Sequence, residues 1–459
     1  MKIKTQLIVV LALLIVAVSS PLTAQWSYTG DLQIARSSHT ATLLNNGKVL
    51  IAGGKNLREV ELYDPGTGSF SLTGSTNKYF MQGSSATLLP DGRVLLAGGI
   101  SGEKYAEIYD PATGLFTATD SLETNHSFHT ATLLADGRVL IAAGKNYKEN
   151  QSHAVAEIYD PASGTFSRTG SLLTDRSGHA AIQLADGRVL IAGGGQTTGP
   201  GTAITLLSCE IYDPVTGLFT ATGKMSVYHS GFSLSPLPDG RILAVGAFSS
   251  TACDIFDPQT GLWSEAGAAL NTRRRNMQTV ALGNGRILFI GGLIPAITRS
   301  VEIYDPVSGT FAFADSTNAP RCDHSATLLQ DGRILVAGGY TGGADVKTAE
   351  LITPAALGVA AAEPTLPADY SLRQNYPNPF NSGTVVEYTL LRPGTVTVQV
   401  LDLSGKTIAI LEQGFRQAGL HRMQWSGRDA AGRELPSGCY FLRLTAPGSL
   451  QSRKMLLLR

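Results

Sequence analysis

The sequence predicts an all-β protein in which a seven-bladed β-propeller, closed by an N-terminal strand, precedes a small β-sandwich. Three observations support this fold class. A nine-residue pattern recurs seven times at intervals of 45 to 53 residues, a period typical of propellers and solenoids. Glycine accounts for 51 of 459 residues and only 16% of residues are charged, which favours short strands and tight turns. The strand pattern changes after an Ala- and Pro-rich stretch at 353–369, which indicates a second domain.

The first 24 residues have the order of a secretory signal peptide. Lys2 and Lys4 precede an apolar run from Leu7 to Val18, and small residues lead to a cleavage position at Ala24. The alternative is an uncleaved anchor, although the run is short for a membrane span. No Cys follows Ala24, so a lipoprotein is not expected. No later segment reaches transmembrane length, and we expect a secreted or cell-surface monomer.

Each repeat contains four short strand-forming segments. "DGRVLIAGG" covers residues 186–194, and its relatives begin at residues 46, 91, 136, 239, 284 and 331. The Asp-Gly pair predicts a hairpin turn between an alternating strand and the apolar strand. A third strand leads into an Asp-Pro turn, as in "EIYDPATGLF" at 107–116, and an aromatic residue opens the fourth strand. Four antiparallel strands per repeat predict one propeller blade.

The two ends of the array predict a closed ring. The seventh repeat stops at "AELITPAALG", residues 349–358, without an aromatic outer strand. The segment "WSYTGDL" at 26–32 matches the outer-strand segment "FSLTGST" that begins at residue 70. We therefore expect Trp26 to Gly30 to complete the seventh blade, because this pairing removes two exposed sheet edges.

The paired Gly after an apolar strand, followed by Tyr-Asp-Pro and an aromatic residue, resembles the kelch repeat. The resemblance covers residues 25 to about 355 and implies a kelch-type propeller domain at 25–355. It implies no single function, because this fold hosts unrelated activities. A linker at 356–369 follows.

The last domain, residues 370–459, contains short alternating strands separated by Gly, Pro and Asn turns, which predicts a β-sandwich. The motifs "NYPNPFN" (375–381), "LDLSGK" (401–406) and "RKMLLLR" (453–459) resemble the type A C-terminal sorting domain of the type IX secretion system. The resemblance implies an immunoglobulin-like fold, export by the type IX machinery across a Gram-negative outer membrane, and removal of this tail. It also implies release or attachment to surface lipopolysaccharide. Two departures are "NSGT" after Phe380 and Cys439 where Val is usual. The alternative is an ordinary sandwich used for adhesion.

Composition excludes some partners. The chain has 36 basic and 36 acidic residues and a formal net charge of zero, so nothing attracts it globally to nucleic acid or an anionic membrane. The four cysteines show no disulfide framework. Cys209 and Cys253 stand where other repeats have small apolar residues, and we expect them to be buried thiols.

The loops between second and third strands are longest at 145–155 and 195–208. Variable loops on a rigid frame commonly carry binding sites. We therefore expect the rim of blades three and four to hold a ligand, with unselected length variation as the alternative.

One position in the blade-to-blade loops is basic in six of the seven repeats. The ligand-binding candidates at this position are Arg36, His126, Arg176, His229, Arg274 and Arg321, and the exception is Met81. A ring of cations at the channel mouth would bind an anion such as a carboxylate or an acidic sugar. The alternative is that these side chains brace neighbouring blades or pair with acids. The run "RRR" at 273–275 adds positive charge locally.

Three positions further on, a histidine opens the first strand of four repeats: His39, His129, His179 and His324. Four histidines raise the possibility of a metal site. However, residues related by a ring are spread apart and do not gather around one ion. We expect structural histidines bonded to the backbone, and no metal.

The segment "VYHSGFSLSPLPDGRI" at 227–242 resembles a stretch of the copper radical oxidases related to galactose oxidase. The resemblance implies that Tyr228 and His229 would be copper ligands. That family also requires a second Tyr crosslinked to a Cys of the following blade, and another His. Here the following blade has "RRRNMQ" and no Cys, Cys322 lies two blades on, and Tyr79 lacks the expected spacing.

We therefore predict a propeller that recognises an extracellular glycan or protein, without a cofactor. The alternatives are an extracellular enzyme, either a copper oxidase or a sugar-acting type, and a structural surface component. Copper enters only under the first of these alternatives.

Overall fold

The computed structural model describes residues 26–354, apart from 81, 101–103, 200–201, 248 and 294, and residues 370–459, apart from 374, 391–393, 403–405, 418 and 447–448. Its elements are β-strands, and these residues contain no α-helix. Accordingly, no helix in the described ranges could cross a bilayer. The chain divides into two compact units, 1–363 and 364–459. The predicted signal peptide (1–24) and linker (356–369) lie outside the described residues.

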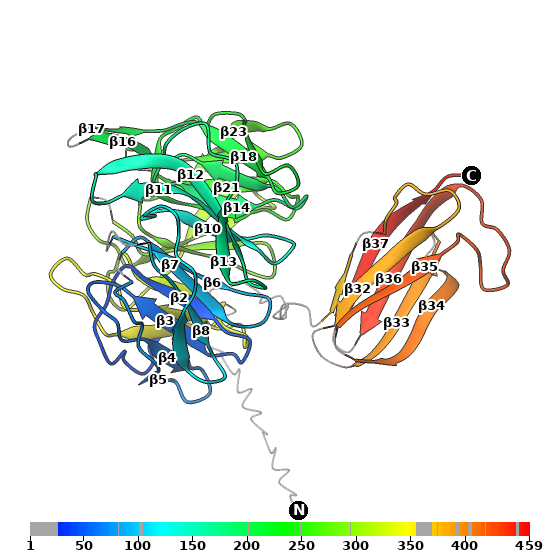
Figure 1. Cartoon of the computed structure of the whole chain (residues 1–459), viewed down its shortest axis with the longest axis horizontal. Helices are drawn as coiled ribbons and strands as arrows, with labels where there is room; N and C mark the ends of the chain where they lie inside the picture. Colours follow the sequence, from blue (N-terminus) through cyan, green and yellow to red (C-terminus); the bar gives the residue numbers. More distant parts are fainter. Residues whose placement is uncertain are drawn as a thin grey trace, which may run out of the picture. The chain divides into compact units, whose positions relative to one another are not determined.

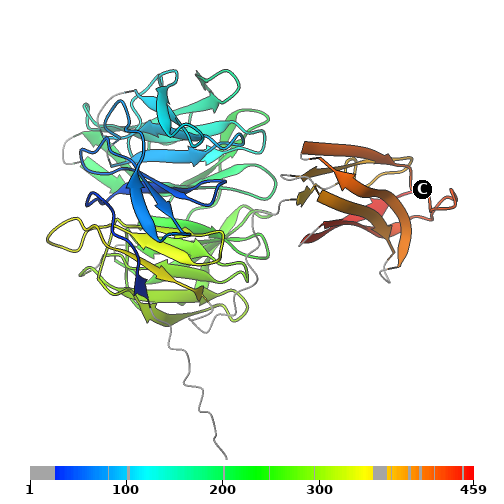
Figure 2. The ribbon, with the colours of Figure 1, turned by 90° about the horizontal axis from the view of Figure 1, so that it is seen from below.

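Unit 1 is a ring of seven four-stranded antiparallel sheets (Figures 1 and 2), so the predicted seven-bladed propeller is confirmed. The first four blades contain β2 (His39–Leu43), β3 (Val49–Gly53), β4 (Glu61–Asp64), β5 (Ser69–Leu72); β6 (Ser84–Leu88), β7 (Val94–Gly98), β8 (Ala106–Asp110), β9 (Leu115–Ala118); β10 (Thr130–Leu133), β11 (Val139–Asn146), β12 (Gln151–Asp160), β13 (Thr165–Arg168); and β14 (Ala180–Gln183), β15 (Val189–Ala192), β18 (Cys209–Asp213), β19 (Leu218–Ala221). The last three contain β20 (His229–Pro236), β21 (Ile242–Ala247), β22 (Ala252–Asp257), β23 (Leu262–Ala269); β24 (Gln278–Ala281), β25 (Ile287–Ile290), β26 (Ser300–Asp305), β27 (Thr310–Ser316); and β28 (Ser325–Leu328), β29 (Ile334–Ala337), β30 (Ala349–Ile352), β1 (Ser27–Tyr28).

The apolar second strands form the core because both of their faces meet a neighbouring blade. All five residues of β3 are buried, as expected for an uninterrupted apolar run. The side chains interlock between blades: Leu50 and Val60 of blade 1 pack in one cluster with Leu96 and Tyr109 of blade 2. The core is therefore a series of apolar layers around the ring.

The Asp-Pro segments form the predicted turns. The Asp64 side chain accepts a hydrogen bond from the backbone N–H of Gly66 at 2.9 Å, and the Gly68 N–H donates to the Asp64 carbonyl at 2.8 Å. The same side-chain bond recurs at Asp110, Asp160, Asp213, Asp257 and Asp305. These carboxylates are occupied by turn geometry, and they do not form catalytic pairs.

The N-terminal strand closes the ring, as the sequence predicts. Ser27 of β1 lies opposite Leu351 of β30, and Trp26 is 3% exposed in the apolar layer between blades 6 and 7, with Ile334 and Ile352. Figure 2 shows the dark blue first strand beside the last propeller blade. Cys209, Cys253 and Cys322 are buried free thiols and Cys439 is half-buried; burial raises the pKa of Cys209 to about 11.

The end of this strand also fastens blade 7 to blade 1. The Thr29 hydroxyl lies 3.0 Å from the Tyr63 hydroxyl, and the Gly30 N–H donates to the Gly68 carbonyl at 2.8 Å. A Cβ on Gly30 would lie only 2.5 Å from that carbonyl oxygen, so the close approach requires glycine.

Because the strands of each blade are antiparallel, the loops divide between two faces of unit 1. Asp-Gly hairpins and Asp-Pro turns share one face, named here the turn face. Loops between second and third strands, and loops between blades, share the other, named the long-loop face. On the long-loop face, blade 3 has an extended β11–β12 hairpin and blade 4 has the arm of β16 (Gly195–Gly199) and β17 (Thr202–Thr205).

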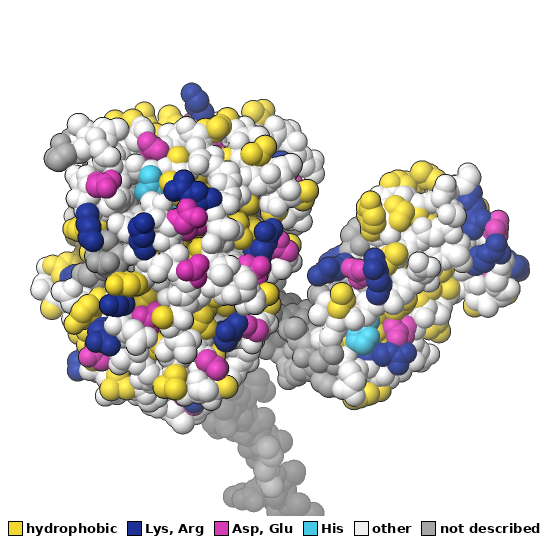
Figure 3. All heavy atoms as spheres, viewed as in Figure 1, with side chains coloured by type: hydrophobic (Ala, Val, Ile, Leu, Met, Phe, Trp, Pro, Cys, Tyr) yellow, Lys and Arg dark blue, Asp and Glu magenta, His cyan; other side chains and the backbone are white. Residues whose placement is uncertain are grey.

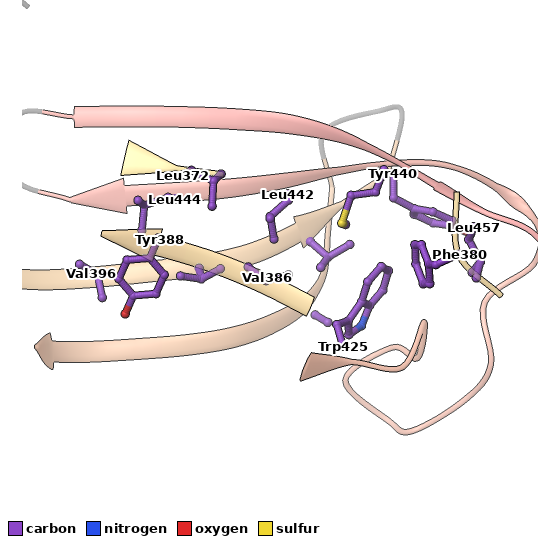
Figure 4. Close-up of a cluster of buried hydrophobic side chains, with 14 of the residues drawn as sticks. Leu372, Phe380, Val386, Tyr388, Val396, Trp425, Tyr440, Leu442, Leu444 and Leu457 are labelled. Atoms are coloured by element: carbon purple, nitrogen blue, oxygen red, sulfur yellow. The ribbon is translucent and has the colours of Figure 1, made fainter. Parts of the chain in front are cut away.

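Unit 2 is a sandwich of two antiparallel sheets. The strand orders are β31-β32-β35 and β34-β33-β36-β37. The strands are β31 (Tyr370–Leu372), β32 (Thr384–Leu390), β33 (Gly394–Leu401), β34 (Thr407–Arg416), β35 (Gly419–Trp425), β36 (Gly438–Ala446) and β37 (Ser449–Leu457). Figure 4 shows Trp425, Tyr440 and Phe380 at one end of the core and Tyr388 and Val396 at the other. Alternating residues of both sheets supply this core, as expected for a sandwich.

Candidate functional site

The six basic residues of the blade-to-blade loops are each paired with a carboxylate of a third strand. The side-chain distances are 2.7 Å for Arg36–Glu61, 2.9 Å for His126–Glu157, 2.7 Å for Arg176–Glu210, 3.1 Å for His229–Asp254 and 2.5 Å for Arg274–Glu302; Arg321 pairs with Glu350. All six basic side chains are 0% exposed. This placement corresponds to the bracing interpretation and argues against a ring of free cations, because a buried and paired charge cannot meet a ligand.

The same carboxylates hold the loops that connect the blades. Glu302 accepts the backbone N–H groups of Asn271 at 2.7 Å and Thr272 at 3.1 Å. Glu107 of blade 2 accepts the N–H groups of Asn77 and Lys78, both at 3.0 Å. Equivalent bonds occur in the other blades at Glu61, Glu157, Glu210, Asp254 and Glu350. Each third-strand carboxylate therefore fixes a blade-to-blade loop, whether the repeat has Arg, His or Met at the cation position.

His126 and His229 replace arginine in two of these pairs. His229 Nδ1 lies 2.8 Å from the Gly246 carbonyl and Nε2 lies 3.1 Å from Asp254. His126 repeats the arrangement with Ala143 and Glu157. In both histidines each ring nitrogen faces an oxygen of the protein, so both nitrogens are engaged within the blade. Burial pushes the pKa of Glu157 upward, but the bonds from His126 and the loop backbone hold it below its usual value.

Three of the four first-strand histidines connect neighbouring blades, whereas His324 is buried without a hydrogen-bond partner among the described residues. His39 Nε2 lies 2.9 Å from the Ser325 hydroxyl, and His129 and His179 contact Ser85 and Thr130 at 2.8 and 2.9 Å. In each case the hydroxyl belongs to the preceding blade. The structural interpretation fits, but the partner is a hydroxyl side chain and not the backbone, because the adjacent first strands approach closely around the channel.

Acid is expected to destabilise the propeller through these histidines. Burial, and to a smaller extent repulsion from Arg176, lowers the pKa of His179 to about 3. Burial and the smaller repulsion from Arg36 lower the pKa of His39 to about 3 as well. The unfolded chain binds protons near pH 6.5, where the folded histidines stay neutral. The contribution of each histidine to the free energy of unfolding is therefore fully present above pH 6.5. It is lost as the pH falls toward 3, and the loss is roughly 2–3 kcal/mol per histidine at pH 4.5.

The measurement is the melting temperature of the wild type and of His179→Phe between pH 7 and 4.5. Phenylalanine is the matched replacement because Phe232 occupies this repeat position in blade 5. The variant should lose less stability on acidification than the wild type. Parallel pH curves for the two proteins would contradict this role.

The residues singled out for copper do not form a metal site. Tyr228 is 54% exposed, whereas His229 is fully buried with both ring nitrogens bonded. Tyr79 is also exposed, and Cys322 is buried beside Asp323. In the described ranges, no three His, Cys, Asp or Glu side chains are arranged to hold a metal ion. Both ring nitrogens of His229 already face protein oxygens, so neither is directed toward a metal, and these residues do not fit the group.

The long-loop face carries a pocket of 520 Å³ between blades 5 and 6, named here the loop pocket. It is lined by Ser249, Ser250, Thr251, Asn271, Thr272, Arg273 and Pro295. These residues come from the β21–β22, β23–β24 and β25–β26 loops. The lining thus combines four hydroxyl side chains, the Asn271 amide and the Arg273 guanidinium with a proline ring. The volume lies within the range of roughly 300–1,000 Å³ that small-ligand sites occupy.

The rim predicted at blades 3 and 4 is built differently. The two long hairpins there bond to one another: the Thr197 N–H donates to the Ser152 hydroxyl at 3.0 Å, and Ser177 bridges to Gly195. Tyr147 and Ile204 remain exposed. Loop length predicted a ligand site at this rim, but the loop pocket lies at blades 5 and 6. The sequence feature at that place is the run "RRR" at 273–275.

Two smaller pockets, of 320 and 250 Å³, lie on the turn face between blades 1 and 2 and between blades 2 and 3. Asp-Gly and Asp-Pro turns line both. Their arginines are paired within the same turn, as in Arg138–Asp136 at 2.7 Å. Asp110 and Asp160 also line these pockets, so carboxylates outnumber arginines at both.

Comparisons with known proteins support the two folds. The FlgD Ig-like domain model matches residues 381–449 of unit 2. A solved fungal alcohol oxidase of the AA5 family, in complex with copper, is similar with a TM-score of 0.60 and 16% identity, over 95% of this chain and 100% of the oxidase. At this identity the likeness shows a shared fold alone. No curated protein matches the chain.

Proposed function

We propose that this protein is a secreted or surface-displayed kelch-type propeller that recognises a glycan through its long-loop face. The observation that carries the proposal is the loop pocket, where hydroxyl and amide side chains line a concave surface on a rigid ring. Saccharides present dense donors and acceptors, and side chains that can both donate and accept suit them. A protein ligand on the same face is the other form of recognition.

The β23–β24 loop of the pocket is held in place before any ligand binds. Glu302 accepts three hydrogen bonds from Asn271 and Thr272 and also pairs with Arg274. A binding surface that is fixed in advance loses little conformational entropy on association. This supports recognition by a built surface and not by a flexible loop.

The tail is proposed to direct export through the type IX machinery, followed by its removal. The immunoglobulin-like sandwich and the motifs at 375–381 and 453–459 support this role. The test is to express a chain that lacks residues 370–459. This chain is expected to stay inside the outer membrane. Normal export of that chain would contradict the proposal.

The second candidate function is an extracellular oxidase, favoured by the likeness to the fungal alcohol oxidase. Tyr228 and His229 would have to rearrange for this role, since His229 is committed to Asp254 and Gly246. Oxygen uptake on alcohols and sugars after copper addition would support the oxidase. Its absence, with glycan binding retained, supports recognition.

The full chain is expected to bind a subset of saccharides on a glycan array, and Ser249→Trp is expected to abolish that binding. Ser249 is exposed at the pocket, so an indole there obstructs the site without disturbing the core. The control is Arg58→Gln, on the corresponding loop of blade 1, which should bind normally. No bound glycan, or binding that Ser249→Trp leaves intact, would overturn the proposed site.

A further inference from the structure

In the described part of the chain, Arg273 is the one charged side chain that lines the loop pocket. It is exposed, and among the described residues it has no ion-pair or hydrogen-bond partner for its guanidinium. The turn-face arginines differ, since Arg93 and Arg138 pair with Asp91 and Asp136. Figure 3 likewise shows basic and acidic side chains interspersed on the surface that it presents. Arg273 thus places an uncompensated positive charge at a concave polar site.

The backbone on both sides of Arg273 is anchored. The preceding residue, Thr272, donates its N–H to Glu302 at 3.1 Å. The following residue, Arg274, is buried and pairs with Glu302 at 2.5 Å. Arg275 exchanges backbone hydrogen bonds with Leu293 at 3.2 and 2.9 Å. The three arginines therefore have separate roles: Arg274 and Arg275 hold the loop, and Arg273 is presented to the pocket.

We infer that the loop pocket takes a saccharide that bears a carboxylate, with Arg273 binding the carboxylate. The inference rests on the proposed glycan recognition and narrows it to uronic-acid chemistry. A guanidinium matches a carboxylate with two parallel N–H donors, and charge-assisted bonds of this kind are the strongest that a surface site offers. Ser249, Ser250 and Thr251 line the same space, and their hydroxyl groups suit the sugar hydroxyls.

The lining also accounts for the sugar ring itself. Pro295 supplies the apolar part of the lining, against which the C–H face of a pyranose can pack. The Asn271 amide is fixed by its bond to Glu302 at 3.0 Å, which leaves its carbonyl oxygen as an acceptor. A charged anchor, hydroxyl partners and an apolar wall together describe a site for an acidic sugar.

The test compares the full chain and Arg273→Gln by calorimetry with trigalacturonic acid and with its methyl ester. Wild-type protein is expected to bind the acid about ten- to a hundredfold more tightly than the ester, the range for a charged hydrogen bond. Arg273→Gln should remove this preference and lower the affinity for the acid to about that for the ester. Arg58→Gln is the matched control on the same face and should bind as wild type does.

The outcomes separate the inference from the proposed function. Equal binding of acid and ester that Ser249→Trp abolishes would overturn the carboxylate assignment and leave glycan recognition standing. Acid preference that survives in Arg273→Gln would overturn the role of Arg273. Absence of binding to both probes and to the glycan array would remove the proposed function as well.

Discussion

Replacing Trp26 with alanine is expected to lower the free energy of unfolding of the propeller by about 3–5 kcal/mol. Trp26 is 3% exposed and packs between blades 6 and 7. Its loss leaves a cavity beside Ile334 and Ile352 and weakens the strand that closes the ring. The pairing of Ser27 and Tyr28 with β30 and the bonds of Thr29 and Gly30 to blade 1 remain in the variant, so the loss is confined to the packing of Trp26.

The measurement combines chemical denaturation with hydrogen exchange. In Trp26→Ala, amides of β30 and β1 should exchange faster than amides of blades 2 to 4, because the ring opens first at its closure. Trp263→Ala is the matched control, since Trp263 lies in the outer strand of blade 5, where the chain is continuous. Uniform exchange around the ring, or a loss below about 1 kcal/mol, would contradict the closure role.

Breaking one buried ion pair is expected to cost nearly as much. Arg176→Met leaves the Glu210 carboxylate buried without its cation and removes bonds to the carbonyls of Gly193 and Ser208, both at 2.9 Å. Removal of one partner from a buried pair typically costs about 3–5 kcal/mol. The double variant Arg176→Met with Glu210→Gln should recover part of that loss, because the uncompensated charge disappears.

Denaturant unfolding of the two single variants and the double variant measures the coupling. Arg168→Met is the control: its pair with Glu123 is exposed at both ends and should contribute about 0–1 kcal/mol. Blade 2 offers a natural comparison, since Met81 stands at the cation position in the sequence while Glu107 keeps its backbone donors. If Arg176→Met and Arg168→Met lose equal stability, the pairs are not structural braces.

The candidate site was predicted less well than the fold. Basic residues at one repeat position suggested a cation ring, but a repeat position gives no direction for the side chain. The partner of Arg176 is Glu210, 34 residues later in the chain, and only the blade geometry brings them together. The long loops at 145–155 and 195–208 similarly indicated variability, yet they bond to each other, and the loop pocket formed where shorter loops meet.

The sequence by itself determined the number of blades, the turns and the closure by Trp26 to Gly30. Hairpin turns, strand alternation and repeat spacing act between residues close in the chain, so they can be read without coordinates. The tertiary structure alone decided that six basic side chains point inward to carboxylates, that histidines bond hydroxyls of the preceding blade, and that Arg273 faces the loop pocket. Burial and side-chain pairing depend on distances between blades, which the spacing of a repeat leaves open.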